Sequence, residues 1–321
     1  MKTTVTLHDF HPKPADLKRE VLEGLASEPK HLPCKFLYDE KGSELFDQIT
    51  KLDDYYPART ETAILENCID EVAERIGPRA MVVEYGSGTS TKTPLLLNAL
   101  YQPDAYVPIE ISREYLIDSA ERINEQFPSL DVIPICADYI ESFEPPEDVL
   151  LHENRMVFFP GSTIGNFEPH EAIEFLGKMK RMVGSEGHLL LGVDLLKDPE
   201  VLIAAYNDSE GVTAEFNLNL LDRINRELGA NFQRDQFYHQ ALFNEAKGRM
   251  ELYLFSRRNQ QVELFGQSFS LAADEGIYTE SSYKYTFERF ADVANAAGLE
   301  VEKVWTDERQ WFSVQLLRSL D

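Results

Sequence analysis

The clearest chemical signal in this chain is a short glycine-containing stretch, residues 81–91, with the sequence MVVEYGSGTST. Its first five residues are mostly apolar and are typical of a buried parallel strand. Gly86 and Gly88 follow directly. Glycines let the backbone turn sharply and approach a ligand closely, because a Cβ atom would block both. We therefore expect a nucleotide-type cofactor at this turn.

The neighbours of the glycines distinguish between cofactors. A dinucleotide fingerprint needs a third glycine, but Thr91 stands at that position. Glu84, two residues before Gly86, would repel a pyrophosphate, whereas its carboxylate suits the ammonium or sulfonium group of S-adenosylmethionine. The pattern of apolar run, acid and Gly-x-Gly resembles motif I of the class I methyltransferases. A plain glycine turn between a strand and a helix is the alternative.

Two later strands also end in acids. Residues 106–111 reach Glu110, roughly 20 residues beyond the glycines, where a ribose-binding acid is expected. Residues 132–138 reach Asp138, which Tyr139 follows, and class I methyltransferases commonly hold the adenine there. Ligands of open α/β sheets bind at the carboxyl ends of the strands. We therefore expect one S-adenosylmethionine site along this edge.

Composition narrows the class of partner. The chain has 321 residues, 43% of them hydrophobic, and a formal net charge of −25, so we expect one large or two modest domains with a full core. Nucleic acids and anionic membranes call for basic patches, so this charge favours a small-molecule partner instead. The sequence leaves the oligomeric state open, with a monomer as the simplest expectation.

Cysteine and histidine usage points to a cytoplasmic enzyme without a metal. Cys34, Cys68 and Cys136 are widely spaced, which predicts reduced thiols, and the N-terminus has no apolar leader. Only His8 and His11 lie close together. We therefore expect no metal site.

The order of predicted elements is that of a parallel sheet with one large interruption. A helix over residues 42–50 is expected to end at Tyr55-Tyr56-Pro57, and a helix over 61–76 leads into the glycine strand. A fourth strand, 156–159, runs into PGSTIGNF, where Asn166 would meet the reacting end of a substrate. A fifth strand covers 188–195.

About ninety residues then intervene before the last helix and two closing strands, and such a block cannot be a loop. It starts helical and becomes β, with strands over 237–243, 248–256 and 260–271. The predicted fold is α/β: a class I (Rossmann-like) S-adenosylmethionine-dependent methyltransferase core with an inserted second α/β domain. Residues 60–196 plus 286–321 would bind the cofactor, and residues 1–59 plus 197–285 the amino-acid substrate.

Motifs along nearly the whole chain resemble those of the ergothioneine-pathway histidine Nα-methyltransferases. They are KFLYDEKGSELFDQIT, YYPARTE, EYGSGTSTKT, PGSTIGNF, LLLGVDLLKD, GVTAEFN and TESS. In that family an insertion joins the N-terminal segment to form the amino-acid site. The resemblance implies α-amine trimethylation of L-histidine to hercynine, with S-adenosylhomocysteine as the second product and no metal.

The resemblance also implies a set of site residues. Those expected to line the cofactor site are Glu84, Gly86, Gly88, Lys92, Glu110, Asp138 and Tyr139. Those expected to bind the amino acid are Tyr38, Tyr55, Asn166, Tyr206, Glu280 and Ser282. Within the second set, Glu280 and Ser282 would hold the imidazole. Tyr38, Tyr55 and Asn166 would orient the reacting amine, without any of them acting as a strong base.

Three alternatives stay open. Leu252 stands where the best-known family members have a methionine beside the ring, so the enzyme could instead methylate a ring nitrogen of histidine or the α-amine of tryptophan or another indole amino acid. A regulatory pseudoenzyme that only binds S-adenosylmethionine is the non-enzymatic alternative. At Glu280, a plain ion pair with Lys284 competes with the imidazole-binding role.

Overall fold

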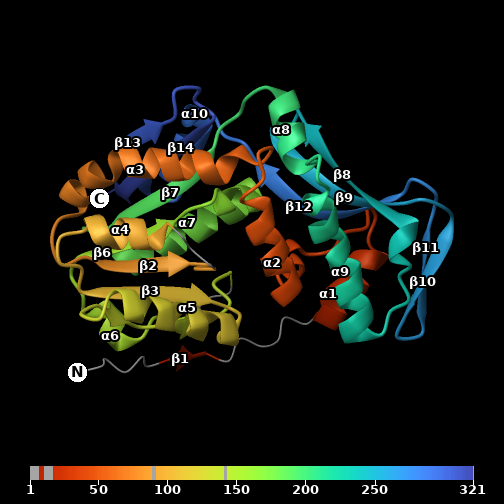
Figure 1. The fold of residues 1–321 in the computed structure, drawn as a ribbon, viewed down its shortest axis with the longest axis horizontal. Coiled ribbons are helices and arrows are strands. Elements are labelled where there is room, and N and C mark those ends of the chain that lie inside the picture. Colours follow the sequence, from red (N-terminus) through yellow and green to blue (C-terminus); the bar gives the residue numbers. More distant parts are fainter. Residues whose placement is uncertain (1–6, 11–16, 89–91, 141–142, 321) are drawn as a thin grey trace. The chain divides into compact units, whose positions relative to one another are not determined.

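The computed structural model describes residues 7–10, 17–88, 92–140 and 143–320. Within these ranges the chain separates into two compact units (Figure 1). Unit 1 falls within Met1–Lys13, Arg59–Leu196 and Tyr285–Asp321, and unit 2 within Pro14–Ala58 and Lys197–Lys284. Thr91 and His11 lie outside the described residues. Each unit is described on its own.

Unit 1 is built on one twisted sheet with the strand order β1-β5-β3-β2-β6-β7-β14-β13, and β4 also pairs with β3. The strands from β1 to β7 are mutually parallel, and β14 and β13 close the sheet as an antiparallel hairpin. The bounds are β1 (His8–Asp9), β2 (Met81–Tyr85), β3 (Ala105–Glu110), β4 (Asp131–Val132), β5 (Ile135–Cys136), β6 (Arg155–Phe159), β7 (His188–Asp194), β13 (Leu299–Thr306) and β14 (Phe312–Ser319).

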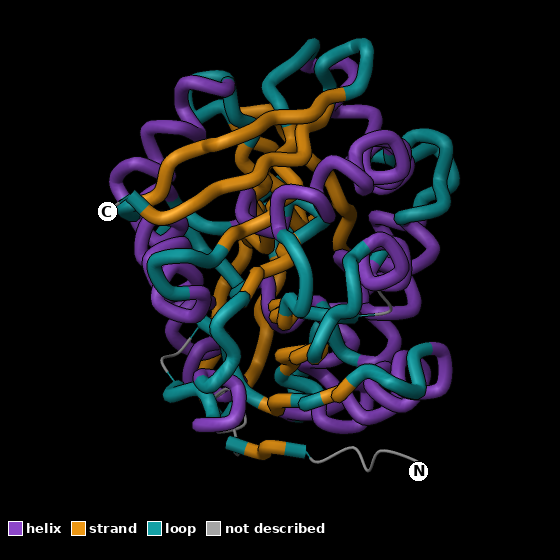
Figure 2. Tube along the Cα trace, turned by 90° about the vertical axis from the view of Figure 1, so that its left-hand side faces the viewer, coloured by secondary structure: helices purple, strands orange, loops and turns teal. Residues whose placement is uncertain are grey.

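Helices cover both faces of this sheet, so the strands of unit 1 lie between helices in Figure 2. Helices α3, α4 and α5 share one core with the face that carries Val82, Tyr106 and Phe158. On the other face, Phe175 of α7 packs on Tyr85 and Phe159, with ring centroids 5.5 and 5.3 Å apart. The bounds are α3 (Tyr56–Ile76), α4 (Thr93–Ala99), α5 (Arg113–Gln126), α6 (Glu147–Leu150), α7 (Pro169–Val183) and α10 (Phe287–Ala296). The predicted fold class is confirmed.

Helix α3 corrects one expectation. The sequence predicts that Tyr55-Tyr56-Pro57 stops a helix, but α3 begins at Tyr56. Pro57 sits in its first turn, where the missing N–H has no intrahelical partner to lose and the fixed φ suits a helix. The proline therefore starts a helix instead of ending one.

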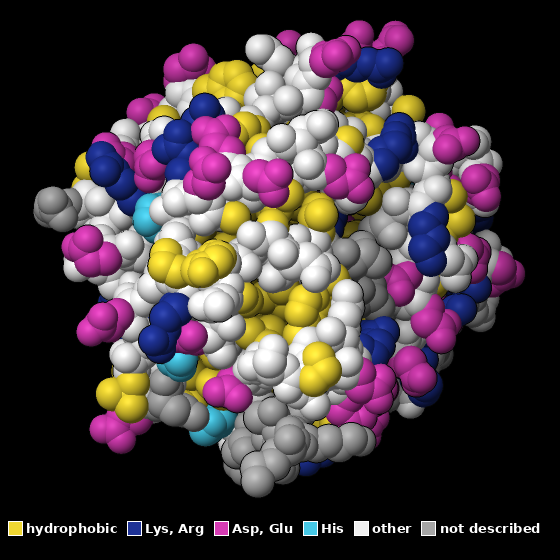
Figure 3. Space-filling model, turned by 60° about the vertical axis from the view of Figure 1, so that its left-hand side comes forward, with side chains coloured by type: hydrophobic (Ala, Val, Ile, Leu, Met, Phe, Trp, Pro, Cys, Tyr) yellow, Lys and Arg dark blue, Asp and Glu magenta, His cyan; other side chains and the backbone are white. Residues whose placement is uncertain are grey.

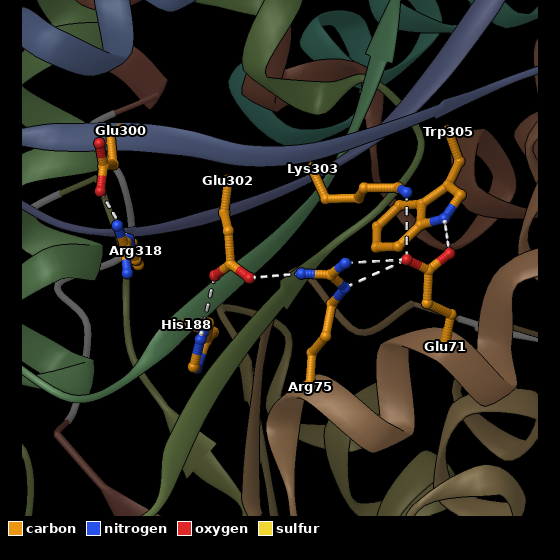
Figure 4. Close-up of polar contacts among 8 residues, drawn as sticks. All are labelled: Glu71, Arg75, His188, Glu300, Glu302, Lys303, Trp305 and Arg318. Carbon is orange, nitrogen blue, oxygen red and sulfur yellow. Dashed lines mark hydrogen bonds and ion pairs between the residues drawn. The ribbon is translucent and has the colours of Figure 1, made fainter.

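A charged network ties α3 to the strands β7 and β13 within unit 1 (Figure 4). Glu71 accepts hydrogen bonds from the Trp305 indole at 2.7 Å and the Arg75 guanidinium at 3.0 Å, and pairs with Lys303 at 3.1 Å. These donors, Trp305 first, lower the pKa of Glu71 to about 2. Glu302 joins the network through Arg75 at 2.6 Å. The network therefore anchors α3 beside the closing hairpin.

Unit 2 combines a three-stranded antiparallel sheet, ordered β12-β9-β8, with a separate hairpin β10-β11. The strand bounds are β8 (Phe237–Asn244), β9 (Arg249–Ser256), β10 (Gln260–Leu264), β11 (Gln267–Leu271) and β12 (Gly276–Tyr283). The predicted single strand over 260–271 is wrong, because the chain reverses at Phe265 and Gly266, which have φ of +50° and +75°. Residues between Leu264 and Gln267 thus form a tight turn.

The helices of unit 2 pack on this sheet and on one another. α9 contacts α2, β8 and β9, and α8 contacts β8 and β9. The bounds are α1 (Leu17–Ala26), η1 (Cys34–Leu37), α2 (Glu40–Ile49), α8 (Pro199–Tyr206), α9 (Val212–Leu228) and η3 (Arg234–Gln236). Asp39 joins α2 to α9: it caps Gly42 and accepts hydrogen bonds from Asn219 at 2.7 Å and Arg226 at 2.5 Å.

The observed units differ from the expected division at the N-terminus. His8 and Asp9 form a parallel pair with Ile135 and Cys136 of unit 1, whereas the sequence predicts that residues 1–59 join the insertion as a whole. The later part of that segment, up to Ala58, does belong with residues 197–284. The substrate-binding role of unit 2 stays a prediction.

No helix among the described residues is long and apolar enough to cross a membrane. On the face shown in Figure 3, acidic side chains are dispersed among Lys and Arg side chains. Cys68 and Cys136 are buried free cysteines.

Candidate active site

Three parallel strands of unit 1 end side by side at the predicted cofactor edge. Gly86 directly follows β2, and its N–H donates to the Ile109 carbonyl of β3 at 2.8 Å. Glu110, the next residue of β3, pairs with Cys136 of β5. Asp138 lies two residues further along that strand end. The sheet therefore brings Gly86, Glu110 and Asp138 to neighbouring positions, as the sequence predicts.

The glycine turn has the geometry that its sequence indicates. Gly86 has a φ of +68° and Gly88 a φ of +44°, which L side chains rarely adopt. A Cβ atom on Gly86 would lie 3.3 Å from the Tyr139 hydroxyl. The Tyr139 ring is held in place by Tyr85 and Phe175, at centroid distances of 5.8 and 5.6 Å. A fixed aromatic ring thus borders a turn whose backbone is open to close approach.

The acids at this edge turn toward the protein backbone. The Glu110 carboxylate accepts hydrogen bonds from the N–H groups of Ile111 at 2.8 Å and Ser112 at 3.4 Å, while burial raises its pKa. Asp138 accepts from the Ile140 N–H at 3.0 Å. Both carboxylates therefore shape the loops that follow their strands, and each carries further lone pairs that a ribose or an adenine amine could use.

Glu84 accepts hydrogen bonds that the sequence does not predict. Its side chain is 1% exposed, and one carboxylate oxygen accepts hydrogen bonds from the Thr93 hydroxyl at 2.7 Å and the Tyr106 hydroxyl at 2.5 Å. Thr93 opens α4 and Tyr106 belongs to β3, so Glu84 joins three elements behind the glycine turn. Its contact with a cofactor stays a prediction.

Lys92 forms an ion pair with Glu61 of α3. The Glu61 carboxylate is 1% exposed and also accepts the Gly161 N–H at 2.9 Å. It reaches this place because Gly192 has no side chain, since a Cβ there would lie 2.0 Å from a Glu61 oxygen. Glu61 therefore joins the loop after β2 to the loop after β6, a role that the sequence analysis misses.

A hydrogen bond from β7 fixes the start of the loop that carries Asn166. Asn166 ends the short 3₁₀ helix η2 (Thr163–Asn166), which follows β6. Ser162, the residue directly before η2, adopts a left-handed conformation with φ +56°. Its hydroxyl accepts a hydrogen bond from the Asp194 N–H at 2.9 Å. Since β6 pairs with β2, this loop and the glycine turn follow neighbouring strands.

In unit 2, a β-bulge decides which way the predicted imidazole-binding residues face. Tyr278 pairs with Tyr253, but the register shifts at Thr279, so that Glu280 pairs with Leu252. Ser282 then pairs with Met250 on the same face. In a regular strand without this shift Glu280 would share the face of Tyr253, because side chains alternate along a strand.

Glu280 is buried beside a cation. Its side chain is 8% exposed, and Lys284 is 1% exposed. Burial raises the pKa of Glu280 to about 7, and the charge of Lys284 acts in the opposite direction. A carboxylate with such a pKa accepts a hydrogen bond when ionised and donates one when protonated.

Ser282 belongs to a hydrogen-bonded trio. The Tyr206 hydroxyl donates to Ser282 Oγ at 2.9 Å, and Lys284 Nζ donates to both oxygens at 2.8 Å. The ammonium group also lies 4.7 Å from the centre of the Tyr206 ring. Lys284 therefore organises two predicted site residues, a role beyond the simple Glu280 pair that the sequence suggests.

A chain of aromatic rings extends this site. Tyr55 meets Tyr206 edge-on at 6.1 Å and Phe46 at 6.5 Å. Tyr38 contacts Phe46 at 5.6 Å and Phe216 at 5.4 Å. Sequence reasoning misses both phenylalanines, although Phe46 lies within the quoted segment KFLYDEKGSELFDQIT. Five of the six predicted amino-acid-binding residues are thus connected within unit 2, and Asn166 belongs to unit 1.

The part of the chain that the structure describes holds no group of three or more His, Cys, Asp and Glu side chains arranged for a metal ion.

Comparison with known proteins identifies the class and then the family. Residues 17–319 match the family described as histidine-specific methyltransferase, SAM-dependent. The chain is 38% identical over 305 residues to the histidine N-alpha-methyltransferase of Mycolicibacterium smegmatis and 39% identical over 305 residues to that of Mycobacterium tuberculosis, with 94% of each chain covered. It is 27% identical over 319 residues to the 4-dimethylallyltryptophan N-methyltransferase of Claviceps purpurea, covering 91% of this chain and 92% of that one.

The doubly wound sheet, the glycine turn and the acids at its strand ends are those of a class I methyltransferase. The chain belongs to the family of histidine-specific, S-adenosylmethionine-dependent methyltransferases. This confirms the family predicted from the motifs.

Proposed function

We propose that this enzyme transfers methyl groups from S-adenosylmethionine to the α-amine of free L-histidine, up to the trimethylated betaine hercynine. The observation that carries the proposal is the buried pair Glu280 and Ser282 on one face of β12. Burying a carboxylate costs free energy unless a polar group forms a hydrogen bond or ion pair with it. A carboxylate and a hydroxyl match the two ring nitrogens of an imidazole.

The cofactor would bind at the strand ends of unit 1, where S-adenosylmethionine supplies an activated methyl group. Gly86 and Gly88 would let the backbone approach it, Glu110 would hold the ribose, and Asp138 with Tyr139 would hold the adenine. Lys92 and Glu84 complete the proposed set. The residues present fit this ligand, because Gly86 leaves its backbone without a side chain and the Tyr139 ring borders the turn.

The amino-acid groups would be held by Tyr206, Tyr55 and Asn166, with Tyr38 beside them. The reacting amine must be unprotonated, and a hydroxyl or amide oxygen can orient its lone pair. In-line placement of this kind supplies about 7–11 kcal/mol of the barrier reduction. We therefore assign no dedicated general base.

The test is a substrate panel. Purified protein is incubated with S-adenosylmethionine and each of the twenty amino acids, and product masses are read. We expect methylated histidine and, because a site built for a ring N–H rejects analogues that lack it, almost no product from phenylalanine or leucine. Turnover of another amino acid in preference to histidine would overturn the proposal.

A second candidate is α-amine methylation of tryptophan or a related indole. It is favoured by Leu252, which is 1% exposed and pairs directly with Glu280, and by the similarity to the Claviceps enzyme. The same panel separates the two, since this candidate predicts methylated tryptophan. We further propose that the enzyme works in the cytoplasm, as the wide spacing of its three cysteines suggests.

A further inference from the structure

The end of helix α8 is held to strand β8 through its backbone. Tyr206 is the last residue of α8, and the last carbonyls of a helix have no intrahelical partner. The Tyr206 carbonyl lies 2.8 Å from His239 Nε2. Beside it, the Asn207 side-chain amide bonds both the N–H and the carbonyl of Ala241, at 2.9 and 3.0 Å. Two residues of β8 therefore fix the end of α8.

The other ring nitrogen of His239 settles the direction of the bond to Tyr206. His239 Nδ1 lies 2.9 Å from the Asn217 side-chain nitrogen, which also donates to the Tyr253 carbonyl at 3.3 Å. Carbonyl oxygens stand at both ends of this chain of bonds, and a carbonyl can only accept. Nδ1 therefore accepts from Asn217, whereas Nε2 carries the proton and donates to Tyr206.

Burial favours this neutral form of the ring. Asn217 is fully buried, and burial lowers the pKa of His239, while the Tyr206 carbonyl and the charge of Asp208 act in the opposite direction. A charged ring would present a second N–H at the place where Asn217 donates. The bonds that run from α9 through β8 to α8 thus depend on an uncharged His239.

Tyr206 is also held at its hydroxyl. This group donates to Ser282 Oγ at 2.9 Å and accepts from Lys284 Nζ at 2.8 Å. The Tyr206 ring meets Tyr55 edge-on, with the centroids 6.1 Å apart. Both tyrosines belong to the proposed amino-acid site, so a shift of the backbone at Tyr206 would displace groups that meet the substrate.

We propose that His239 is a positioning residue for substrate binding, which keeps the Tyr206 side chain in its binding position by donating from Nε2 to the Tyr206 carbonyl. This inference rests on the proposed function and deepens it. His239 acts through Tyr206 and needs no contact of its own with the substrate. Without this bond, the apparent dissociation constant rises in inverse proportion to the fraction of molecules that keep Tyr206 in place.

The test compares two replacements of His239. His239→Leu removes both ring nitrogens and should raise KM for histidine about tenfold, as the loss of one buried hydrogen bond implies. Its kcat should fall by less than about threefold, because the complexes that do form still react. His239→Gln keeps a donor for Tyr206 and an acceptor for Asn217, so its KM should lie within about threefold of the wild-type value.

A role of His239 in folding alone gives a different result, because loss of folded protein lowers the apparent kcat and leaves KM unchanged. His31→Leu is the matched control, since His31 is another histidine of unit 2 and its ring bonds the Ser27 hydroxyl at 2.9 Å. This control should keep the wild-type KM. Affinity for S-adenosylmethionine, read by calorimetry, should stay unchanged in all variants, because the proposed cofactor residues belong to unit 1.

A double variant shows whether His239 acts through Tyr206. Tyr206→Phe removes the hydroxyl, so adding His239→Leu to it should raise KM further by less than about threefold. If His239→Leu folds poorly, His239→Asn takes its place, since its shorter side chain also loses the Tyr206 contact.

Three results would overturn the proposal: an unchanged KM in His239→Leu, an equal rise of KM in His239→Gln, or a further rise of about tenfold in the double variant. Absence of histidine turnover by the wild type would instead refute the proposed function itself.

Discussion

Gly86 tests the cofactor site at the scale of one residue. Gly86→Val should abolish S-adenosylmethionine binding, because a positive φ strains any β-branched side chain by about 1–3 kcal/mol and the Cβ would approach the Tyr139 hydroxyl. Gly77→Val is the control, since Gly77 has a φ of +78° and no atom within 4 Å of a Cβ. Calorimetry on both folded variants should show lost binding only at Gly86; unchanged affinity would remove the proposed cofactor site.

Glu280 tests substrate choice. Glu280→Ala should cost about 2–4 kcal/mol in kcat/KM for histidine, because it removes a charge-assisted hydrogen bond to the ring. Affinity for S-adenosylmethionine, read by calorimetry, should stay nearly unchanged. Wild-type histidine kinetics in this variant would assign Glu280 to a purely structural contact with Lys284.

The Glu280 carboxyl should also make the free energy of unfolding depend on pH. Burial raises the pKa of Glu280 from its usual 4.5 to about 7 in the folded protein, so the folded chain binds this proton more tightly than the unfolded chain does. The contribution of Glu280 to the free energy of unfolding therefore falls as the pH rises from 4.5 to about 7, by about 3 kcal/mol in total.

Glu280→Gln removes that titration. We expect it to raise the free energy of unfolding by up to about 3 kcal/mol at about pH 8 and to leave it nearly unchanged at about pH 4. Urea unfolding at the two pH values measures this. An equal effect at both values would contradict the assigned pKa.

At the scale of elements, helix α3 carries a residue that holds two loops together. Glu61 pairs with Lys92 and accepts the Gly161 N–H. Glu61→Gln should therefore weaken S-adenosylmethionine binding, because Lys92 loses its anchor, and should cost about 1–3 kcal/mol of stability. Glu66→Gln, on an exposed position of the same helix, should change neither quantity. Unchanged binding after Glu61→Gln would separate this pair from the cofactor site.

The elements also show what sequence patterns can and cannot predict. The strand-end positions of Gly86, Glu110 and Asp138 were predictable, because apolar runs followed by glycine or acid mark the carboxyl ends of parallel strands. The helix start at Tyr56 was not, since a proline is equally compatible with ending one helix and beginning the next.

Side-chain direction was harder to predict than element type. The bulge at Thr279 turns Glu280 onto the face of Leu252, and nothing in the local sequence marks the extra residue. The trio of Lys284, Tyr206 and Ser282 joins positions 78 residues apart, which only the folded chain brings together. The hydrogen bonds of Glu84 to Thr93 and Tyr106 were likewise not predictable from the sequence, and its contact with the cofactor stays a prediction.

At the scale of the whole molecule, the two units carry separate predicted tasks. The proposed cofactor residues all belong to unit 1, and the proposed imidazole-binding residues all belong to unit 2. Variants of one unit should therefore change one ligand's affinity with little effect on the other, as the predictions for Gly86 and Glu280 state.

The most direct test of the central claim is the position of the methyl groups on the product. The enzyme is incubated with L-histidine and S-adenosylmethionine, and the product is fragmented in a mass spectrometer. We predict that all added methyl groups lie on the α-nitrogen, so that the final product loses trimethylamine on fragmentation. Methyl groups retained on imidazole fragments, or no transfer to histidine, would contradict the account.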